Sequence, residues 1–371
     1  MPLAALGAAA CAALLLATGC ARFDESAASP FTPEPSYESG ADVRPEAPAP
    51  ESSTPPPPTG PLGPCEDPDP SVLATCLDTL GGLVVLPDTQ SALVAERRTG
   101  RIVEVRPGQE PREFAQIPVD GSADGGLLDI ALSPTFVEDN LVYAYVTTGS
   151  DNRVVRVAGG DSPKVVLSGI PKGSTGNRGS LEFASPHELL VLTGDAGNPS
   201  AATSTDSLAG KLLRLRTFDA GSATQPEVVA SGFGTVGGLC VDPGVAVWAT
   251  DRTSMEDRLQ RVPVEGGPPT TVWTWPDRLG VGGCVASQGV VAVSLAAGQA
   301  MSALTADIST GAVTAAPALL AQERYGRLEG AALSADGQIW ASTSNKTDGE
   351  PSPTDDRVVR IPMPDGGGSA D

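Results

Sequence analysis

Short apolar segments separated by turns recur along most of the chain and give its hydrophobic pattern a clear period. Six of these segments open with Gly-Leu or a close variant, and each leads through a turn into a second apolar segment. The six openings are Gly82-Leu83, Gly126-Leu127, Ser180-Leu181, Gly238-Leu239, Gly283-Cys284 and Gly330-Ala331. Successive openings lie 44, 54, 58, 45 and 47 residues apart, which indicates one structural unit repeated six times.

Each unit continues through further segments rich in β-branched and aromatic residues, as expected for packed strands. Second strands are predicted at 92–95, 142–145, 189–192, 247–250, 290–293 and 339–342. Third strands, which begin with a basic residue and then alternate, are predicted at 101–105, 153–157, 211–215, 258–262 and 357–361. The fifth unit, near 302–304, has lost this third-strand pattern. Fourth strands are predicted at 114–117, 165–167, 228–230, 271–273 and 318–320.

Four strands in each of six units predict an all-β fold, a six-bladed β-propeller of four-stranded antiparallel blades. The sixth unit has no fourth strand of its own, because Pro362-Met363-Pro364 follows its third strand. We therefore expect residues 72–77, at the N-terminal side of the repeats, to supply that strand and close the ring. Closure of this kind leaves no open sheet edge.

The N-terminal part of the chain has a different composition from the repeats. Residues 1–20 form an apolar run that ends in Leu-Ala-Thr-Gly-Cys, the pattern of a lipoprotein signal peptide in which Cys20 carries the lipid. Proline and serine dominate residues 21–64, which predicts a disordered tether. The propeller is then expected over 65–366, with a flexible tail at 367–371. The predicted location is extracytoplasmic, on the outer face of a membrane, to which the lipid attaches the protein.

The net charge of −21, from 45 acidic and 24 basic side chains, would repel a phosphate backbone and argues against nucleic acid as a partner. After removal of Cys11 with the signal and lipidation of Cys20, four cysteines remain in an oxidising compartment. Proximity in the sequence favours the disulfides Cys65–Cys76 and Cys240–Cys284, although four cysteines allow three connectivities. A zinc site is not expected, since there is one histidine and no CxxC motif.

Several segments carry a resemblance to a known family. The segment from Gly125 to Phe136 (GGLLDIALSPTF) resembles the second blade of the quinoprotein glucose/sorbosone dehydrogenases, and the segments at 181–183, 193–195, 208–214 and 273–276 follow the order and spacing of that family. This resemblance implies a pyrroloquinoline quinone site at the mouth of the propeller channel, possible calcium binding and activity on sugars. The lipobox and the proline-rich tether add a resemblance to mycobacterial lipoproteins.

The residues needed for sugar oxidation depart from that family's pattern. Gly176 stands where the family has the histidine base, and glycine cannot accept a proton. The single histidine, His187, is predicted to lie in a surface turn. Glu329 places a carboxylate where the family's sixth blade is expected to offer a guanidinium, so it would repel a tricarboxylate cofactor.

Two functions remain open from the sequence. The first is a non-oxidising module on the envelope that binds a small molecule, such as a sugar, or an envelope protein. The alternative is a pyrroloquinoline quinone-dependent aldose dehydrogenase with another base, for instance Asp129 or Glu329. In both cases, the predicted residues at the channel mouth are Asp124, Asp129, Asn177, Arg178, Arg252 and Glu329. Asp195 and Asn198 are weak candidates for calcium ligands, since their oxygen atoms suit a hard cation.

Overall fold

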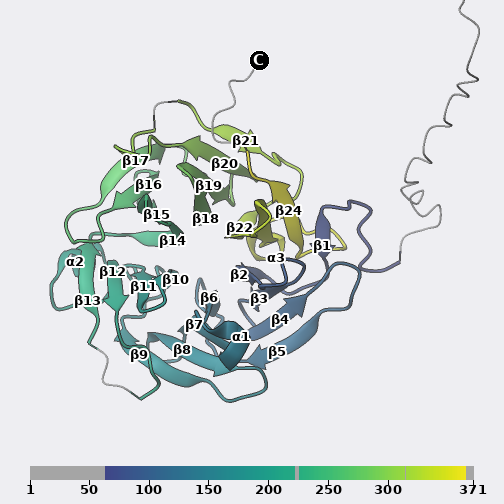
Figure 1. The fold of residues 1–371 in the computed structure, drawn as a ribbon, viewed down its shortest axis with the longest axis horizontal. Coiled ribbons are helices and arrows are strands. Elements are labelled where there is room, and N and C mark those ends of the chain that lie inside the picture. Colours follow the sequence, from purple (N-terminus) through teal and green to yellow (C-terminus); the bar gives the residue numbers. More distant parts are fainter. Residues whose placement is uncertain (1–62, 222–224, 314, 365–371) are drawn as a thin grey trace, which may run out of the picture. The chain divides into compact units, whose positions relative to one another are not determined.

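The computed structural model describes residues 63–221, 225–313 and 315–364, and these residues form six four-stranded antiparallel sheets arranged as blades around a central channel (Figure 1). The predicted six-bladed β-propeller is therefore confirmed. From the channel outwards, the strands of the first blade are β2 (Leu80–Val85), β3 (Ala92–Glu96), β4 (Arg101–Val105) and β5 (Arg112–Gln116). Those of the second blade are β6 (Leu127–Leu132), β7 (Leu141–Thr147), β8 (Asn152–Ala158) and β9 (Lys164–Ile170). Those of the third blade are β10 (Gly179–Ser185), β11 (Glu188–Thr193), β12 (Lys211–Leu215) and β13 (Glu227–Ser231).

The other three blades follow the same order. The fourth blade consists of β14 (Thr235–Asp242), β15 (Ala246–Arg252), β16 (Asp257–Val262) and β17 (Thr270–Trp275). The fifth consists of β18 (Val281–Ser287), β19 (Val290–Leu295), β20 (Ala300–Thr305) and β21 (Ala318–Leu320). The sixth consists of β22 (Leu328–Leu333), β23 (Gln338–Thr343), β24 (Val358–Pro362) and β1 (Val72–Ala74). In the described part of the chain, three short helices lie in connections: α1 (Phe136–Asp139), α2 (Pro199–Thr203) and α3 (Asn345–Asp348). No helix within the described ranges is long and apolar enough to cross a membrane.

The hydrophobic core is divided into six clusters, one between each pair of neighbouring blades. Between the third and fourth blades, for example, Leu190 and Leu212 pack with Leu239 and Val247. Both faces of a blade are thus buried, and strict alternation of apolar and polar residues is not required. This explains why β20 forms a third strand although its sequence lacks the expected pattern. Its residues are all buried from Ala300 to Leu304.

The Gly-Leu openings reflect the close approach of neighbouring innermost strands. A Cβ atom on Gly238 in β14 would lie 2.6 Å from the Cα atom of Gly283 in β18. No side chain fits into such a distance, so glycine is required where the two strands converge on the channel.

An N-terminal strand closes the ring, as predicted, but it is shorter than expected. β1 pairs antiparallel with β24, with Val72 opposite Val359, and ends at Ala74 rather than at residue 77. Beyond β1 the pairing becomes irregular, although the backbones of Leu77 and Asp356 still exchange two hydrogen bonds of 3.1 Å. A register shift within β1 accounts for its early end.

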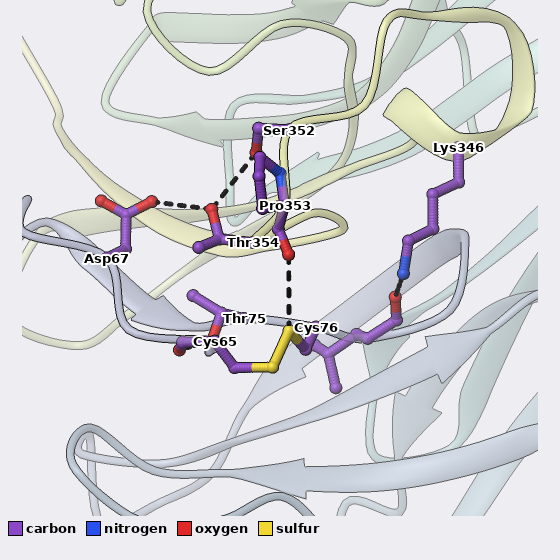
Figure 2. Close-up of a disulfide and its surroundings, with 9 residues drawn as sticks. Cys65, Asp67, Thr75, Cys76, Lys346, Ser352, Pro353 and Thr354 are labelled. Atoms are coloured by element: carbon purple, nitrogen blue, oxygen red, sulfur yellow. Dashed lines mark hydrogen bonds between the residues drawn. A yellow bond between two sulfur atoms is a disulfide. The ribbon is translucent and has the colours of Figure 1, made fainter. Parts of the chain in front are cut away.

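The disulfide Cys65–Cys76 joins a residue that precedes β1 to one that follows it, and Figure 2 shows its surroundings. The Sγ atom of Cys76 lies 3.7 Å from the carbonyl oxygen of Pro353, and Thr354 donates a hydrogen bond of 3.1 Å to Asp67 (Figure 2). The second predicted disulfide, Cys240–Cys284, joins β14 to β18. Both predicted pairings are present. The signal peptide, the tether up to residue 62 and the tail at 367–371 lie outside the described residues.

Candidate functional site

The predicted site residues come from several blades but gather largely at one rim of the channel, which we call the mouth. Innermost strands begin and second strands end at this rim, because the two run antiparallel. Arg178 directly precedes β10, Arg252 is the last residue of β15, and Glu329 is the second residue of β22. Asp124 and Asn177 lie in the loops before β6 and β10.

A carboxylate shared by two arginines occupies the mouth. Arg178 forms an ion pair with Glu329, and Nη2 of Arg252 lies 3.8 Å from the same Glu329 oxygen, Oε1. The side chains of Arg178 and Glu329 are only 18% and 9% exposed. Arg252 also donates hydrogen bonds to the carbonyl oxygens of Val281 (2.6 Å) and Gly280 (3.2 Å). The third, fourth and sixth blades are therefore linked through Glu329.

Positive charge is concentrated around this pair. Burial lowers the pKa of Arg178 well below its ordinary value, and repulsion from Arg252, Arg97 and Arg327 acts in the same direction. Burial likewise lowers the pKa of Arg252 to about 10. The sequence interpretation did not include Arg97 or Arg327 among the mouth residues. Arg97 is the first residue of the turn after β3 and donates to the carbonyl oxygen of Gly125 at 2.6 Å, a contact that only the folded ring reveals.

Asp124 holds the loop before β10 in place. Its carboxylate accepts hydrogen bonds from the backbone N–H of Gly176 (2.6 Å) and from the side-chain amide of Asn177 (2.7 Å). Asn177 is buried, and its side-chain oxygen accepts from the backbone of Gly173 at 2.9 Å. Asp124 and Asn177 thus bind each other and the loop backbone.

Gly176, at the position of the expected histidine base, has no room for a side chain. Its φ angle is +72°, and a Cβ atom would lie 2.4 Å from Oδ1 of Asp195 and 2.5 Å from the backbone nitrogen of Gly197. A histidine at this position would displace the loop that carries Asp195 and would be strained as well. The local structure is therefore built around glycine.

Asp129, in β6, lies in the wall of the channel, and its carboxylate is held by three hydrogen bonds. It accepts hydrogen bonds from the hydroxyl of Ser180 (2.5 Å) and from the backbone N–H groups of Leu181 and Ile130 (3.0 Å each). Burial nevertheless raises the pKa of Asp129 to about 6. Asp129, Arg178 and Glu329 line the same central cavity.

Glu182 is an additional acidic residue of the channel that the sequence interpretation did not select. It lines the same cavity, and burial together with the neighbouring charge of Asp129 raises the pKa of Glu182 to about 8. In the sequence, Glu182 looks like any polar residue of an alternating strand. Only closure of the ring places it inside a channel.

The raised pKa of Glu182 predicts how stability depends on pH. The folded protein keeps the Glu182 proton up to about pH 8, whereas the unfolded chain loses it above the ordinary value of 4.5. Stability contributed by this group is therefore present below pH 4.5 and is lost as pH rises towards 8. At pH 8 we expect Glu182→Gln to raise the free energy of unfolding by about 2 kcal/mol, with little effect at pH 4.5.

Urea denaturation at both pH values measures this difference. Glu110→Gln is the matched control, because Glu110 is exposed, and it should leave stability unchanged at either pH. An equal effect of Glu182→Gln at pH 4.5 and pH 8 would contradict the assignment.

The weak calcium candidates make ordinary loop contacts. Oδ1 of Asp195 accepts from the backbone N–H of Gly197 at 2.9 Å, and Oδ1 of Asn198 accepts from the hydroxyl of Ser200 at 2.7 Å. Within the described ranges, no group of three or more His, Cys, Asp or Glu side chains could hold a metal ion. His187 is exposed in the turn between β10 and β11, at the rim opposite the mouth, as predicted.

Comparison with known proteins agrees with this architecture. The family model described as Glucose / Sorbosone dehydrogenase matches residues 77–260, from the closing segment into the fourth blade. The aldose sugar dehydrogenase YliI of Escherichia coli is 28% identical over 234 residues, which is 54% of this chain and 62% of that protein. An uncharacterised Synechocystis protein is 29% identical over 214 residues, 47% of this chain and 51% of that protein. The chain thus matches only about half to three fifths of the length of these curated relatives.

Solved structures extend the similarity over the whole propeller. The pyrroloquinoline quinone-bound aldose sugar dehydrogenase of Streptomyces coelicolor matches with a TM-score of 0.71 and 28% identity, over 78% of this chain and 96% of that one. A putative oxidoreductase (glucose dehydrogenase) of Thermus thermophilus gives a TM-score of 0.70 and 28% identity, over 78% and 98% of the two chains. The protein is therefore a six-bladed propeller similar to the glucose/sorbosone dehydrogenases and to solved aldose sugar dehydrogenases.

Proposed function

We propose that the protein is an envelope lipoprotein whose propeller has lost sugar oxidation and now binds a ligand or a partner protein. The observation that carries this proposal is the position of Glu329 at the mouth. Its carboxylate pairs with Arg178 and lies 3.8 Å from Arg252, so one internal anion already contacts both guanidinium groups.

The residues at the mouth do not fit pyrroloquinoline quinone, the group bound in the Streptomyces structure. A tricarboxylate needs free cationic side chains, and here the two best placed arginines are held by Glu329. A ligand carboxylate that approached them would also meet the charge of Glu329. In addition, Gly176 supplies no base, and its surroundings leave no space for one.

A quinone-dependent aldose dehydrogenase remains the alternative, and one observation favours it. Burial raises the pKa of Asp129 to about 6, nearer to the value that suits a general base at neutral pH. Against this role, Asp129 already accepts three hydrogen bonds from Ser180, Leu181 and Ile130. These bonds occupy three of the about four acceptor positions of the carboxylate and stabilise its charged form, which makes it a weaker base.

Titration of the purified protein with pyrroloquinoline quinone and calcium tests the proposal. We expect no saturable binding by calorimetry up to about 1 mM cofactor, and no aldose-dependent reduction of a dye acceptor. Glu329→Gln keeps the shape of the side chain but removes its charge, so this variant should bind the quinone more tightly than the wild type. Tight binding by the wild type together with aldose turnover would establish the alternative.

The lipid anchor and the envelope location belong to the same proposal and rest on the sequence of residues 1–64. Similarity of Cys20-Ala21-Arg22-Phe23, of residues 151–157 and of residues 272–277 further suggests the mycobacterial lipoprotein LppZ as a near relative. The tether would hold the propeller away from the membrane, within reach of a sugar or an envelope protein. Loss of palmitate labelling in Cys20→Ser would support the anchor, and unchanged labelling would exclude it.

A further inference from the structure

The central channel contains a cavity of about 430 Å³ that extends from the ion pair at its mouth along the innermost strands. The innermost strands of all six blades contribute to its wall. A cavity of this size falls within the range of small-molecule sites, roughly 300–1,000 Å³. The charged residues that line it are Asp129, Arg178, Glu182 and Glu329.

Three of these four charged groups already have partners. Arg178 and Glu329 form their ion pair, and Asp129 accepts three hydrogen bonds. Glu182 differs from them, because no hydrogen bond or ion pair joins its carboxyl group to another residue in the part of the chain that the structure describes. Its remaining exposed surface faces the cavity that it lines. The cavity therefore offers one free acidic group.

The rest of the wall is largely apolar or consists of glycine backbone. Val85, Leu132 and Leu333 are the last residues of three innermost strands, at the side away from the mouth. Glycines at the other end, such as Gly238, expose backbone rather than side chains. A single unpaired carboxyl group beside apolar side chains suits a ligand with one cationic group and an apolar body.

We propose that this cavity binds a small organic cation of the primary ammonium class, whose N–H groups donate to the carboxylate of Glu182 and whose apolar part contacts apolar side chains of the wall such as Leu132 and Leu333. The proposal goes beyond the function proposed above and does not depend on it. A neutral ligand of the same shape would lack the charge-assisted hydrogen bond and should bind more weakly.

Binding of an ammonium group is coupled to release of a proton. Since the pKa of free Glu182 is about 8, the carboxyl group is mostly protonated at neutral pH and must give its proton to water before it pairs with the cation. Affinity should therefore increase as pH rises from 6.5 to 8.5. The other charged groups facing the cavity, Asp129 on β6 and the Arg178–Glu329 pair, are held by their own partners.

Titration calorimetry of the full chain with benzylammonium chloride tests this inference, with benzyl alcohol as the neutral analogue. We expect binding at pH 8.5 that weakens about tenfold at pH 6.5, together with a binding enthalpy that depends on the ionisation enthalpy of the buffer. Glu182→Gln should weaken binding at least tenfold at pH 8.5, whereas the control Glu110→Gln should bind like the wild type.

These measurements distinguish binding through the carboxylate of Glu182 from binding that needs neither that carboxylate nor a positive charge on the ligand. No binding at about 10 mM benzylammonium, equal binding by Glu182→Gln, or equal binding of benzyl alcohol would each overturn it. An unchanged circular dichroism spectrum of Glu182→Gln and an unfolding temperature no lower than that of the wild type at pH 6.5 would show that a loss of binding does not come from misfolding. The quinone titration is not involved, so failure here leaves the proposed function untouched.

Discussion

Glu329→Ala is expected to lower the free energy of unfolding by about 3 kcal/mol, because it removes the only acidic partner that the structure describes for two poorly exposed guanidinium groups. Arg178 would lose its ion pair while the repulsion from Arg252, Arg97 and Arg327 remains. Breaking such a pair usually costs more than the pair itself contributes, since the surviving charge stays desolvated. Urea denaturation followed by tryptophan fluorescence measures the loss.

Two variants control for this effect. Glu110→Ala removes an exposed carboxylate from a turn of the first blade and should change stability by less than about 0.5 kcal/mol. The double variant Arg178→Met with Glu329→Met replaces both charges by apolar side chains and should recover at least half of the loss. A loss below about 1 kcal/mol for Glu329→Ala would show that water, rather than Glu329, compensates the two arginines.

Much of the fold could be predicted from the sequence, because a propeller blade is a local structure. Its four strands are consecutive in the first five blades, and turns separate them. The Gly-Leu openings were a reliable marker because innermost strands crowd together at glycines such as Gly238. The differences lie where packing overrides pattern. β20 forms with both faces buried, and β1 ends at Ala74 at an irregularity in its pairing with β24.

The site could be predicted only as a set of residues and not as an arrangement. Arg178, Arg252 and Glu329 were each selected for the mouth, but their mutual pairing depends on closure of the ring, which brings the third, fourth and sixth blades together. Glu182 is the opposite case, a residue of the channel that the sequence does not indicate. Nothing in the alternation of β10 separates a glutamate on the outer surface from one that lines the channel cavity.

Removal of the disulfide Cys240–Cys284 by a double alanine substitution is expected to cost about 4 kcal/mol. The bond closes a loop of 44 residues and joins β14 to β18, the innermost strands of two neighbouring blades. In the chain-entropy description, a bond that closes a longer loop removes more freedom from the unfolded chain. Both cysteines are buried, so their replacement also leaves space in the channel wall.

The disulfide Cys65–Cys76 provides the matched comparison, because its removal deletes the same two sulfur atoms from an exposed site with a loop of only 11 residues. We expect a smaller cost of about 3 kcal/mol for this pair, measured by guanidinium denaturation without reductant. The reverse order would indicate that bracing of the closing strand outweighs loop length. In that case the ring would open first at the pairing of β1 with β24, and hydrogen exchange should be fastest at the amide of Val72 and its neighbours.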